Sequence, residues 1–423
     1  MKLIILLICM LCLNSCVFKE VNYGFKKQDL KRKDFRELII KTDSLKQINI
    51  LKNSWENLSF KVSKLIDSCL IIPLETNGEN LIGRIDELKI YEDKIYILDK
   101  RMAKSVFVFD LKGKYIGEIG KKGKGPGEYP KPDGFEIDIV NRELLVISVG
   151  KRKILRYDFK GNFLGYHKIK IANHDIKVLD NGNMVFLGGD QRNNHLGELK
   201  NKIIYITNNK GDLLSYGPTA PSDYVNVKEV RGGNMMVQNN EISYSYKYSD
   251  TIFQVRGNEL IAQYKLNFIN CALNRRKYKD KSFGDFVNSL KNEPTSPALF
   301  NGSHFQTTDY LIFNFTVKEF VYTGFYNKNQ SKLIMGQPIY DETKIYFAPL
   351  ILSSYNDYFV SYESAYRIKQ ILKANSESSI EKQSLITALK KNNSLDINEE
   401  DNPVLFFYKF KKEYHETKKE VFN

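Results

Sequence analysis

Short runs of mostly hydrophobic residues alternate with polar turns through most of this 423-residue chain. The runs are rich in β-branched and aromatic side chains, and Gly, Asn and Asp separate them. They include residues 94–98, 105–109, 144–147, 154–157, 184–187 and 203–206. Period-two alternation over such lengths is typical of β-strands, and strands about ten residues apart are typical of a sandwich, a barrel or a propeller.

An internal repeat favours the propeller. The segments 106–120 (VFVFDLKGKYIGEIG), 154–168 (ILRYDFKGNFLGYHK) and 203–217 (IIYITNNKGDLLSYG) each contain a strand, a polar turn with Lys-Gly and a second strand. The Lys-Gly pairs lie at 112–113, 160–161 and 210–211, so the period is 48 and then 50 residues, and a weaker copy places Gly257 46 residues later. Glycine supplies the positive φ that a tight hairpin needs, and a four-strand repeat of this length is typical of one propeller blade.

We therefore predict an all-β fold, a six-bladed β-propeller with small helical insertions. The blades are expected near residues 81–120, 134–170, 174–217, 225–267, 304–335 and 341–410. The insertions are expected at 270–300, with a helix near 280–292, and at 363–400, with two amphipathic helices. Because a closed ring leaves no open sheet edge, we expect the late strand 404–410 to pair beside the early run 67–75.

Six glycines between Gly117 and Gly134 raise the question of a phosphate-binding loop. Pro126 stands where such a loop needs a lysine, and Pro also removes a backbone N–H that an anion site would use. The residues that follow are typical of a turn and a strand, whereas a dinucleotide-binding glycine motif opens a helix. We interpret the segment as the crossover turn between two blades.

The N-terminus predicts export. Residues 3–13 form an apolar stretch of eleven after Lys2, which is too short to span a bilayer (about 20 residues) and is typical of a signal peptide. Residues 13–16 (Leu-Asn-Ser-Cys) match a bacterial lipobox, in which Cys16 would receive diacylglycerol; an ordinary secretory leader is the alternative.

These features define the expected domains. They are a lipoprotein signal peptide (1–15), a lipidated tether (16–57) with one short helix near 36–48, the propeller (58–412) and a C-terminal tail (413–423). We expect an exported protein held to a bacterial membrane, the outer membrane, through the acyl chains on Cys16, on either its periplasmic or its external side.

The formal net charge is +14, and most basic residues are lysines scattered through loops. One dense run comprises Lys26, Lys27, Lys31, Arg32 and Lys33. This distribution indicates a solvated surface with some attraction to anionic lipid headgroups, and it gives no single basic face for nucleic acid.

The mature chain keeps two cysteines besides Cys16. Cys69 and Cys271 lie about 200 residues apart without the CxxC spacing of a zinc or redox site, and in an exported protein they could form a disulfide. The apolar run around Cys69 favours a buried free thiol.

Three segments carry a family resemblance. They are 120–135 (GKKGKGPGEYPKPDGF), 250–268 (DTIFQVRGNELIAQYKLNF) and 402–410 (NPVLFFYKF). They resemble the six-bladed β-propeller lipoproteins of Bacteroidetes-type bacteria, which are related in architecture to NHL-repeat propellers. The resemblance extends over nearly all of 67–410 and departs from the family pattern at 336–349 (GQPIYDETKIYFAP). It implies the fold and the location, and it implies no particular reaction.

Candidate chemistry is sparse. The histidines show no HxH or HExxH spacing, so a metal site would have to be assembled from several blades, and we predict neither a metal nor a cofactor. The histidines to inspect are His167, His174 and His304, although each is better accounted for as a surface or blade-edge residue than as a metal ligand. The acidic residues near blade starts are Asp133, Glu136, Asp138 and Asp175. Four aromatic residues are expected to be exposed at loop tips, where they could stack on a sugar or peptide: Tyr129, Tyr224, Tyr244 and Tyr246.

Two classes of function stay open. The first is a ligand-binding or protein-interaction module that holds a glycan, a peptide or a protein over one end of the central channel. The alternative is an NHL-like propeller enzyme, a metal-assisted lyase or a hydrolase acting on glycans or peptides. An enzyme would bring His or carboxylate side chains from several blades to within about 3–4 Å of one point on the axis, whereas a binding module would present aromatic and amide groups on one rim.

Overall fold

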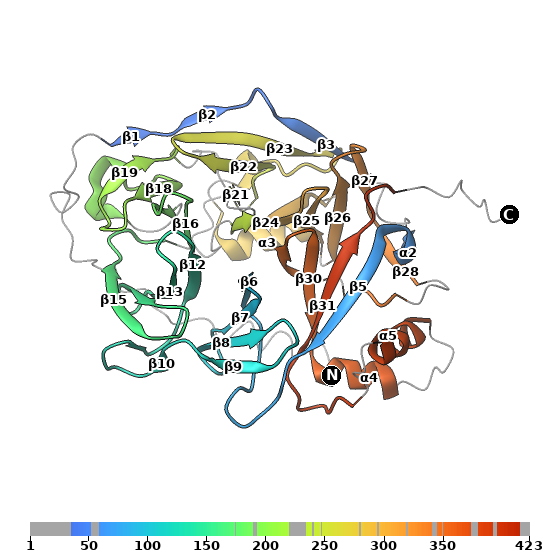
Figure 1. Ribbon diagram of the computed structural model, residues 1–423. Coiled ribbons are helices and arrows are strands. Elements are labelled where there is room, and N and C mark those ends of the chain that lie inside the picture. Colours follow the sequence, from blue (N-terminus) through green and yellow to red (C-terminus); the bar gives the residue numbers. More distant parts are fainter. Residues whose placement is uncertain are drawn as a thin grey trace.

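A ring of six small sheets forms the molecule (Figure 1). The computed structural model describes residues 35–51, 59–173, 175–188, 193–219, 234–238, 241–246, 248–278, 281–293, 296–318, 320–340, 345–348, 350–373, 380–391 and 396–414. The predicted fold class, a six-bladed β-propeller with small helical insertions, is confirmed.

Each blade has a core of four antiparallel strands, whose order runs from the channel outward. Blade 1 contains β6 (Glu87–Tyr91), β7 (Lys94–Asp99), β8 (Ser105–Asp110) and β9 (Tyr115–Glu118). Blade 2 contains β12 (Gly134–Asp138), β13 (Glu143–Ser148), β14 (Lys153–Tyr157) and β15 (Phe163–Lys168). Blade 3 contains β16 (Asp175–Val178), β17 (Met184–Leu187), β18 (Ile204–Thr207) and β19 (Leu213–Tyr216).

The second half of the ring is more irregular. Blade 4 contains β20 (Asn234–Gln238), β21 (Glu241–Ser245), β22 (Thr251–Arg256) and the long β23 (Glu259–Ile269). Blade 5 contains β24 (Ala298–Gln306), β25 (Tyr310–Val317), β26 (Phe320–Asn327) and β27 (Lys332–Ile334). Blade 6 contains β29 (Ile351–Tyr355), β30 (Tyr358–Glu363), β31 (Val404–Phe410) and β5 (Ile66–Pro73), which comes from the N-terminal part of the chain.

The hydrophobic core is divided into six layers, one between each pair of neighbouring blades. Strand β13 shows how alternation produces this division. Leu144 and Val146 pack against blade 1, whereas Leu145 and Ile147 pack against blade 3. Successive side chains of a strand point to opposite faces, so a strand with apolar residues on both faces is stable only between two other blades.

The predicted pairing of the two chain ends is confirmed. β5 pairs antiparallel with β31 and forms the outermost strand of blade 6, with Ile71 opposite Phe406. On β31, Phe406 and Tyr408 belong to the layer shared with blade 5, and Leu405 and Phe407 belong to the layer shared with blade 1. The closing strand therefore completes two core layers.

The Lys-Gly turns have the predicted conformation. Gly113, Gly161, Gly211 and Gly257 have φ values of 83°, 86°, 78° and 54°. In the first turn, the Asp110 carboxylate accepts hydrogen bonds from the backbone N–H groups of Lys112 (2.8 Å) and Lys114 (2.9 Å). Asp158 and Asn208 accept equivalent bonds in the next two blades. The three turns therefore share one hydrogen-bond pattern.

The glycine-rich segment is a crossover between blades 1 and 2, as predicted. It contains two short parallel strands, β10 (Lys121–Lys122) and β11 (Glu128–Tyr129). Two tyrosine hydroxyls hold it: Tyr129 donates to the carbonyl of Ile119 (2.5 Å) and Tyr157 donates to that of Gly127 (2.7 Å).

The expected helix near residues 36–48 is wrong. Residues 35–51 and 59–61 instead follow the outer rim (Figure 1) and are called the strap below. β1 (Arg36–Glu37) pairs parallel with β19, and β2 (Ile39–Lys41) and β3 (Lys46–Leu51) pair parallel with β23. β4 (Ser59–Lys61) pairs with β28 (Gln337–Ile339), and the short helix α2 (Val62–Leu65) leads into β5.

The physical reason is that outer strands present unpaired backbone groups, which an extended segment satisfies. Ile48 and Ile50 also alternate inward and are buried, which is the pattern of a strand. The part of the expected tether from Arg36 to Leu51 thus lies on the rim of blades 3 and 4.

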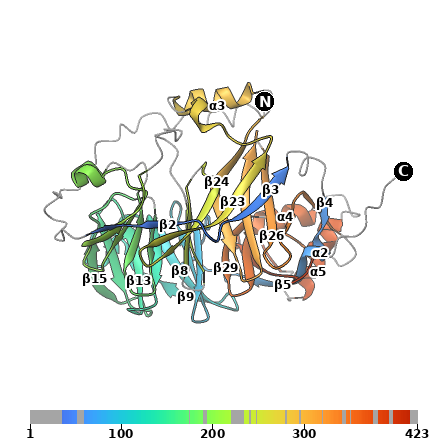
Figure 2. The ribbon, with the colours of Figure 1, turned by 90° about the horizontal axis from the view of Figure 1, so that it is seen from above.

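The helices predicted in the two insertions are confirmed. α3 (Phe283–Lys291) lies in the insertion between blades 4 and 5 and projects from one face of the ring (Figure 2), after the one-turn helix η4 (Arg275–Tyr278). The Ser282 hydroxyl caps α3 by accepting a bond from the Asp285 N–H. α4 (Ala365–Lys373) and α5 (Ile380–Lys391) bury Ile368, Ile371, Leu385 and Leu389 in the layer between blades 5 and 6. A further one-turn element, η3 (Asn194–Leu199), lies within blade 3.

Two glycines with the same φ give a matched test of ring closure. A Cβ on Gly113 would lie 2.0 Å from the carbonyl oxygen of Pro73 at the end of β5, whereas a Cβ on Gly161 would meet only an ordinary contact at 3.4 Å. Gly161→Ala is expected to lower the free energy of unfolding by about 1 kcal/mol through positive-φ strain. Gly113→Ala is expected to lower it by about 2–4 kcal/mol, because the backbone must also shift.

Urea unfolding of both variants measures this difference. Equal losses for Gly113→Ala and Gly161→Ala would contradict the close approach of the blade 1 turn to the closing strand.

Candidate functional site

A chain of buried and half-buried charges links the inner strands of blades 1, 2 and 3. Lys89 on β6 lies 2.5 Å from the Glu136 carboxylate on β12. Lys177 on β16 lies 3.3 Å from the other oxygen of Glu136 and 2.8 Å from Asp175 on its own strand. These four residues are called the axial network. It joins three consecutive blades near the channel.

Pairing determines the charge states of Glu136 and Lys177, whereas at Lys89 burial outweighs the attraction of Glu136 and lowers the pKa. Burial by itself raises the pKa of the Glu136 carboxyl, but Lys89 and Lys177 outweigh it, so that the pKa lies below its usual range. Burial lowers the pKa of Lys177, and the attraction of Asp175 and Glu136 outweighs it and raises this pKa above its usual range. At neutral pH both groups are charged and paired with each other.

The four acidic candidates divide into two pairs. Glu136 and Asp175 meet at Lys177, as described above. Asp133 accepts a bond from the Val149 N–H (2.8 Å), and Asp138 accepts bonds from the backbone N–H (2.9 Å) and side-chain amide (2.7 Å) of Asn141. The second pair therefore holds turns of blade 2.

His304 is fully buried between blades 4 and 5. Its Nε2 lies 2.8 Å from the Ser243 hydroxyl, and its Nδ1 lies 3.0 Å from the Gly302 carbonyl, which accepts a bond only from a protonated Nδ1. Nε2 is then the acceptor for Ser243. Burial lowers the pKa of His304 to about 4, so the ring is neutral and joins two blades by hydrogen bonds.

His167 does not lie at the same place as His304. His167 lies half-buried on β15, the outer strand of blade 2, and burial followed by repulsion from Arg156 lowers its pKa. His174 lies outside the described residues. Within the described ranges, no group of three or more His, Cys, Asp or Glu side chains is arranged to hold a metal ion.

The expectation that the aromatic candidates are exposed is wrong. Tyr129, Tyr244 and Tyr246 are all buried, and Tyr224 lies outside the described residues. Tyr244 stacks on Phe253 with ring centroids 5.1 Å apart. Strand alternation turns these rings into the interblade layers, which leaves them unable to stack on a ligand.

The two cysteines of the propeller are free thiols. Cys69 lies on β5 and Cys271 follows β23. Burial raises the pKa of the Cys69 thiol to about 12, so this group is protonated and unreactive at neutral pH.

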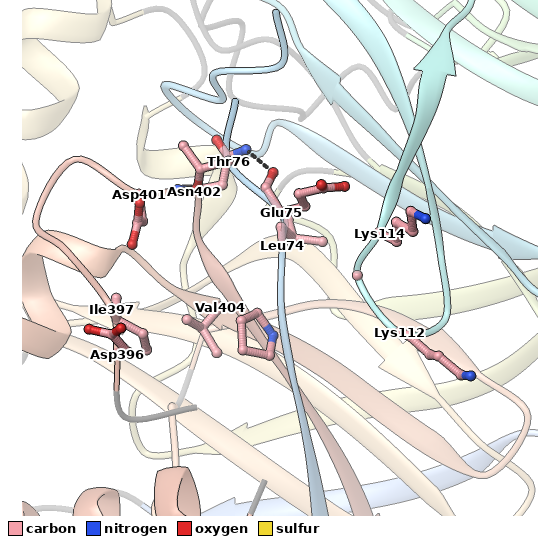
Figure 3. A pocket seen from close by; sticks show the side chains of 12 residues that line it. Leu74, Glu75, Thr76, Lys112, Lys114, Asp396, Ile397, Asp401, Asn402 and Val404 are labelled. Carbon is pink, nitrogen blue, oxygen red and sulfur yellow. Dashed lines mark hydrogen bonds between the residues drawn. The ribbon is translucent and has the colours of Figure 1, made fainter. Parts of the chain in front are cut away.

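A cleft of about 380 Å³ opens where the ring closes, and we call it the seam cleft (Figure 3). Three segments form it: the residues after β5, the Lys-Gly turn of blade 1 and the loop before β31. Its lining residues are Pro73, Leu74, Glu75, Thr76, Lys112, Gly113, Lys114, Asp396, Ile397, Asp401, Asn402 and Val404. The sequence prediction did not find this cleft.

Asn402 holds the walls of the seam cleft together. Its amide nitrogen donates to the carbonyls of Glu75 (2.8 Å) and Asn80 (3.0 Å), and its side-chain oxygen accepts a bond from the Ile82 N–H (2.8 Å). Its backbone N–H donates to the Thr76 hydroxyl (2.8 Å). The one sequence clue was the Asn-Pro pair that opens the segment 402–410.

The charges of the seam cleft are separated. Lys112 and Lys114 lie on one side of Glu75, and Asp396 and Asp401 lie on the other (Figure 3). Both lysines and Asp396 are exposed, and in the described part of the chain none of the three has an ion-pair partner. The apolar lining residues Leu74, Ile397 and Val404 are buried and expose little surface to the cleft.

A second cavity of about 220 Å³ lies between blades 4 and 5 near η4. Tyr248, Phe268 and Phe300 line it together with Lys265 and Arg275. It is smaller than the seam cleft and its lining is more aromatic.

The fold defines the class as a six-bladed β-propeller, and the family follows from the match. The chain belongs to the family described as a domain of unknown function, DUF4934, whose model matches residues 45–409. No curated protein sequence matches the chain.

One solved structure shares the fold, and two others show a weaker likeness. A Bacteroides fragilis protein described as exported has a TM-score of 0.69 and 19% identity, over 87% of this chain and 100% of that one. A DUF4221 family member from Bacteroides vulgatus has a TM-score of 0.48 and 11% identity, over 82% and 97% of the two chains. A streptogramin B lyase has a TM-score of 0.38 and 12% identity, over 69% and 80%. At these identities the likeness concerns the fold alone.

The buried His304 predicts a pH dependence of stability. Its pKa is about 4 in the folded protein and about 6.5 in the unfolded chain, so the unfolded chain binds an extra proton between these values. The stabilisation is complete above pH 6.5 and is lost as the pH falls toward 4. Between pH 7 and pH 5 the loss is about 2 kcal/mol.

His304→Gln is expected to remove this component from the pH dependence of urea unfolding. His167→Gln on the outer strand is the matched control and is expected to change the dependence less. If the His304→Gln variant keeps the pH dependence of unfolding that the wild type shows, His304 is not the group that causes it.

Proposed function

We propose that this protein is an exported, lipid-anchored propeller that binds a ligand in the seam cleft without transforming it. One contrast carries the proposal. The charged groups of the axial network are paired with one another, whereas the exposed Lys112, Lys114 and Asp396 have no ion-pair partner among the described residues. Groups left without partners at a concave surface are available to a ligand.

The same contrast weighs against the NHL-like enzyme. Carboxylates from two blades do converge, at Lys177, but the lysine neutralises them. A general acid or base needs a proton-transfer group that is free and close to its substrate. The described inner strands hold Glu136, Asp175 and His304 in structural contacts instead.

The membrane anchor is proposed from the sequence. Residues 1–15 are the signal peptide and Cys16 is the lipidation site of a tether that leads to Phe35, which packs at the boundary of blades 2 and 3. Among the described helices, none has the length and apolarity to cross a bilayer. The description of the Bacteroides fragilis neighbour as exported agrees with this proposal. The membrane we propose is the outer membrane.

Substituting Cys16 tests the anchor. Cys16→Ser is expected to abolish incorporation of an alkyne-labelled fatty acid and to move the protein from the detergent phase to the aqueous phase in Triton X-114 partitioning. Cys12→Ser, within the predicted leader, is the matched control and keeps both properties. Labelling that persists in Cys16→Ser would exclude this residue as the anchor.

Charge reversal tests the cleft. Lys112→Glu combined with Lys114→Glu is expected to abolish binding of at least one probe class on arrays of defined peptides and oligosaccharides. Lys160→Glu alters the equivalent turn of blade 2, outside the seam cleft, and is expected to leave binding unchanged. The cleft is not a ligand site if the wild type binds no probe. The same conclusion follows if the wild type, the double variant and the Lys160→Glu control bind every probe equally.

A further inference from the structure

We propose that the ligand of the seam cleft is an extended peptide segment with acidic residues at one end and basic residues at the other. This inference rests on the proposed binding function of the cleft and names its ligand class. The acidic end would meet Lys112 and Lys114, and the basic end would meet Asp396 and Asp401.

The charge arrangement selects a chain-like ligand. The lysines belong to the blade 1 turn and the aspartates to the loop before β31, so the two signs of charge come from different segments on opposite sides of Glu75 (Figure 3). A compact ligand, whose positive and negative groups lie close together, contacts only one side of the cleft. An extended chain with separated charges meets both sides at once.

The rest of the lining favours a peptide over a glycan or a nucleic acid. No aromatic side chain is among the lining residues, so the cleft lacks the rings on which sugars and bases stack. Glu75, Asp396 and Asp401 would repel a phosphodiester backbone. Leu74, Ile397 and Val404 expose little surface to the cleft, so only short side chains are expected between the charged ends of the ligand.

The walls are held in place before a ligand arrives. The Asp110 carboxylate fixes the backbone of both lysines, and the Gly113 carbonyl accepts a bond from the Glu75 N–H (2.8 Å). Asn402 fixes the opposite side, as described above. Little ordering is then needed on the protein side, which favours binding.

The affinity is expected to be modest and sensitive to salt. Exposed ion pairs are weak and are screened within a Debye length of about 8 Å at physiological ionic strength. Raising the salt concentration from 0.05 to 0.5 M is expected to weaken binding roughly tenfold. An apolar interaction alone would not show this loss.

Calorimetry with designed peptides tests the charge order. The probe is a blocked octapeptide with two aspartates at one end, two lysines at the other, and alanine and valine between. Its sequence reversal and a peptide of the same composition with alternating charges are the comparisons. One of the two segregated peptides is expected to bind at least tenfold more tightly than the alternating peptide.

Protein variants supply the controls. Lys112→Glu with Lys114→Glu, and separately Asp396→Lys, are expected to weaken the preferred peptide about tenfold, whereas Lys160→Glu has no effect. Combining Lys112→Glu, Lys114→Glu and Asp396→Lys is expected to switch the preference to the reversed peptide. Asp401 is left unchanged because its carboxylate accepts a bond from the Asn398 N–H (2.6 Å). Unchanged melting temperatures show that the variants fold.

The outcomes separate the two proposals. Equal binding of segregated and alternating peptides overturns the charge-order inference. If a neutral oligosaccharide binds and Lys112→Glu with Lys114→Glu abolishes its binding while no peptide binds, the peptide class is wrong but the cleft function stands. If no probe depends on the cleft residues, both proposals fail.

Discussion

The pairing of β5 with β31 is the interaction on which the rest of the structure depends. Each blade buries its two faces only against its neighbours, so six blades give six core layers only when the last blade meets the first. β5 supplies this connection from a position more than 300 residues before β31. Because loop-closure entropy grows slowly with length, one well-packed strand pair is enough to hold such a distant contact. Ile71, Phe406 and Tyr408 make that pair part of the core rather than a surface addition.

Inside the ring, the two halves are held by different chemistry. Blades 1, 2 and 3 share the charged axial network, and blades 4 and 5 share the neutral contact between His304 and Ser243. Buried ion pairs often contribute little net stability, because desolvation offsets the attraction, but breaking one leaves a costly unpaired charge. The axial network therefore acts against wrong registers of the inner strands. Apolar interblade layers tolerate sliding more easily than a lysine that must meet two carboxylates.

Sequence patterning predicted the blades well because each strand carries its own alternation. Leu144 to Ile147 are all apolar and face two different layers, and a short apolar run bounded by turn residues is typical of a strand buried on both faces. The strap was harder to predict because backbone pairing on an outer edge needs few apolar side chains, and only Ile48 and Ile50 of β3 are buried. The family match begins at residue 45, one residue before β3, which indicates that this rim strand is a family feature. Tyr129, Tyr244 and Tyr246 are buried rather than exposed because proximity to a turn does not determine which face a ring occupies.

The seam cleft escaped prediction for a related reason, and its position gives it a further property. Its walls come from residues 73–76, 112–114 and 396–404, which no local pattern connects. A ligand that touches the blade 1 turn and the loop before β31 bridges the first and last blades. Such a ligand binds only the closed ring, so it stabilises the folded state by about 2.7 kcal/mol at a concentration 100 times its Kd. Occupancy of the cleft and closure of the propeller are thermodynamically coupled, and the coupling follows from placing the site at the one junction that the two chain ends complete.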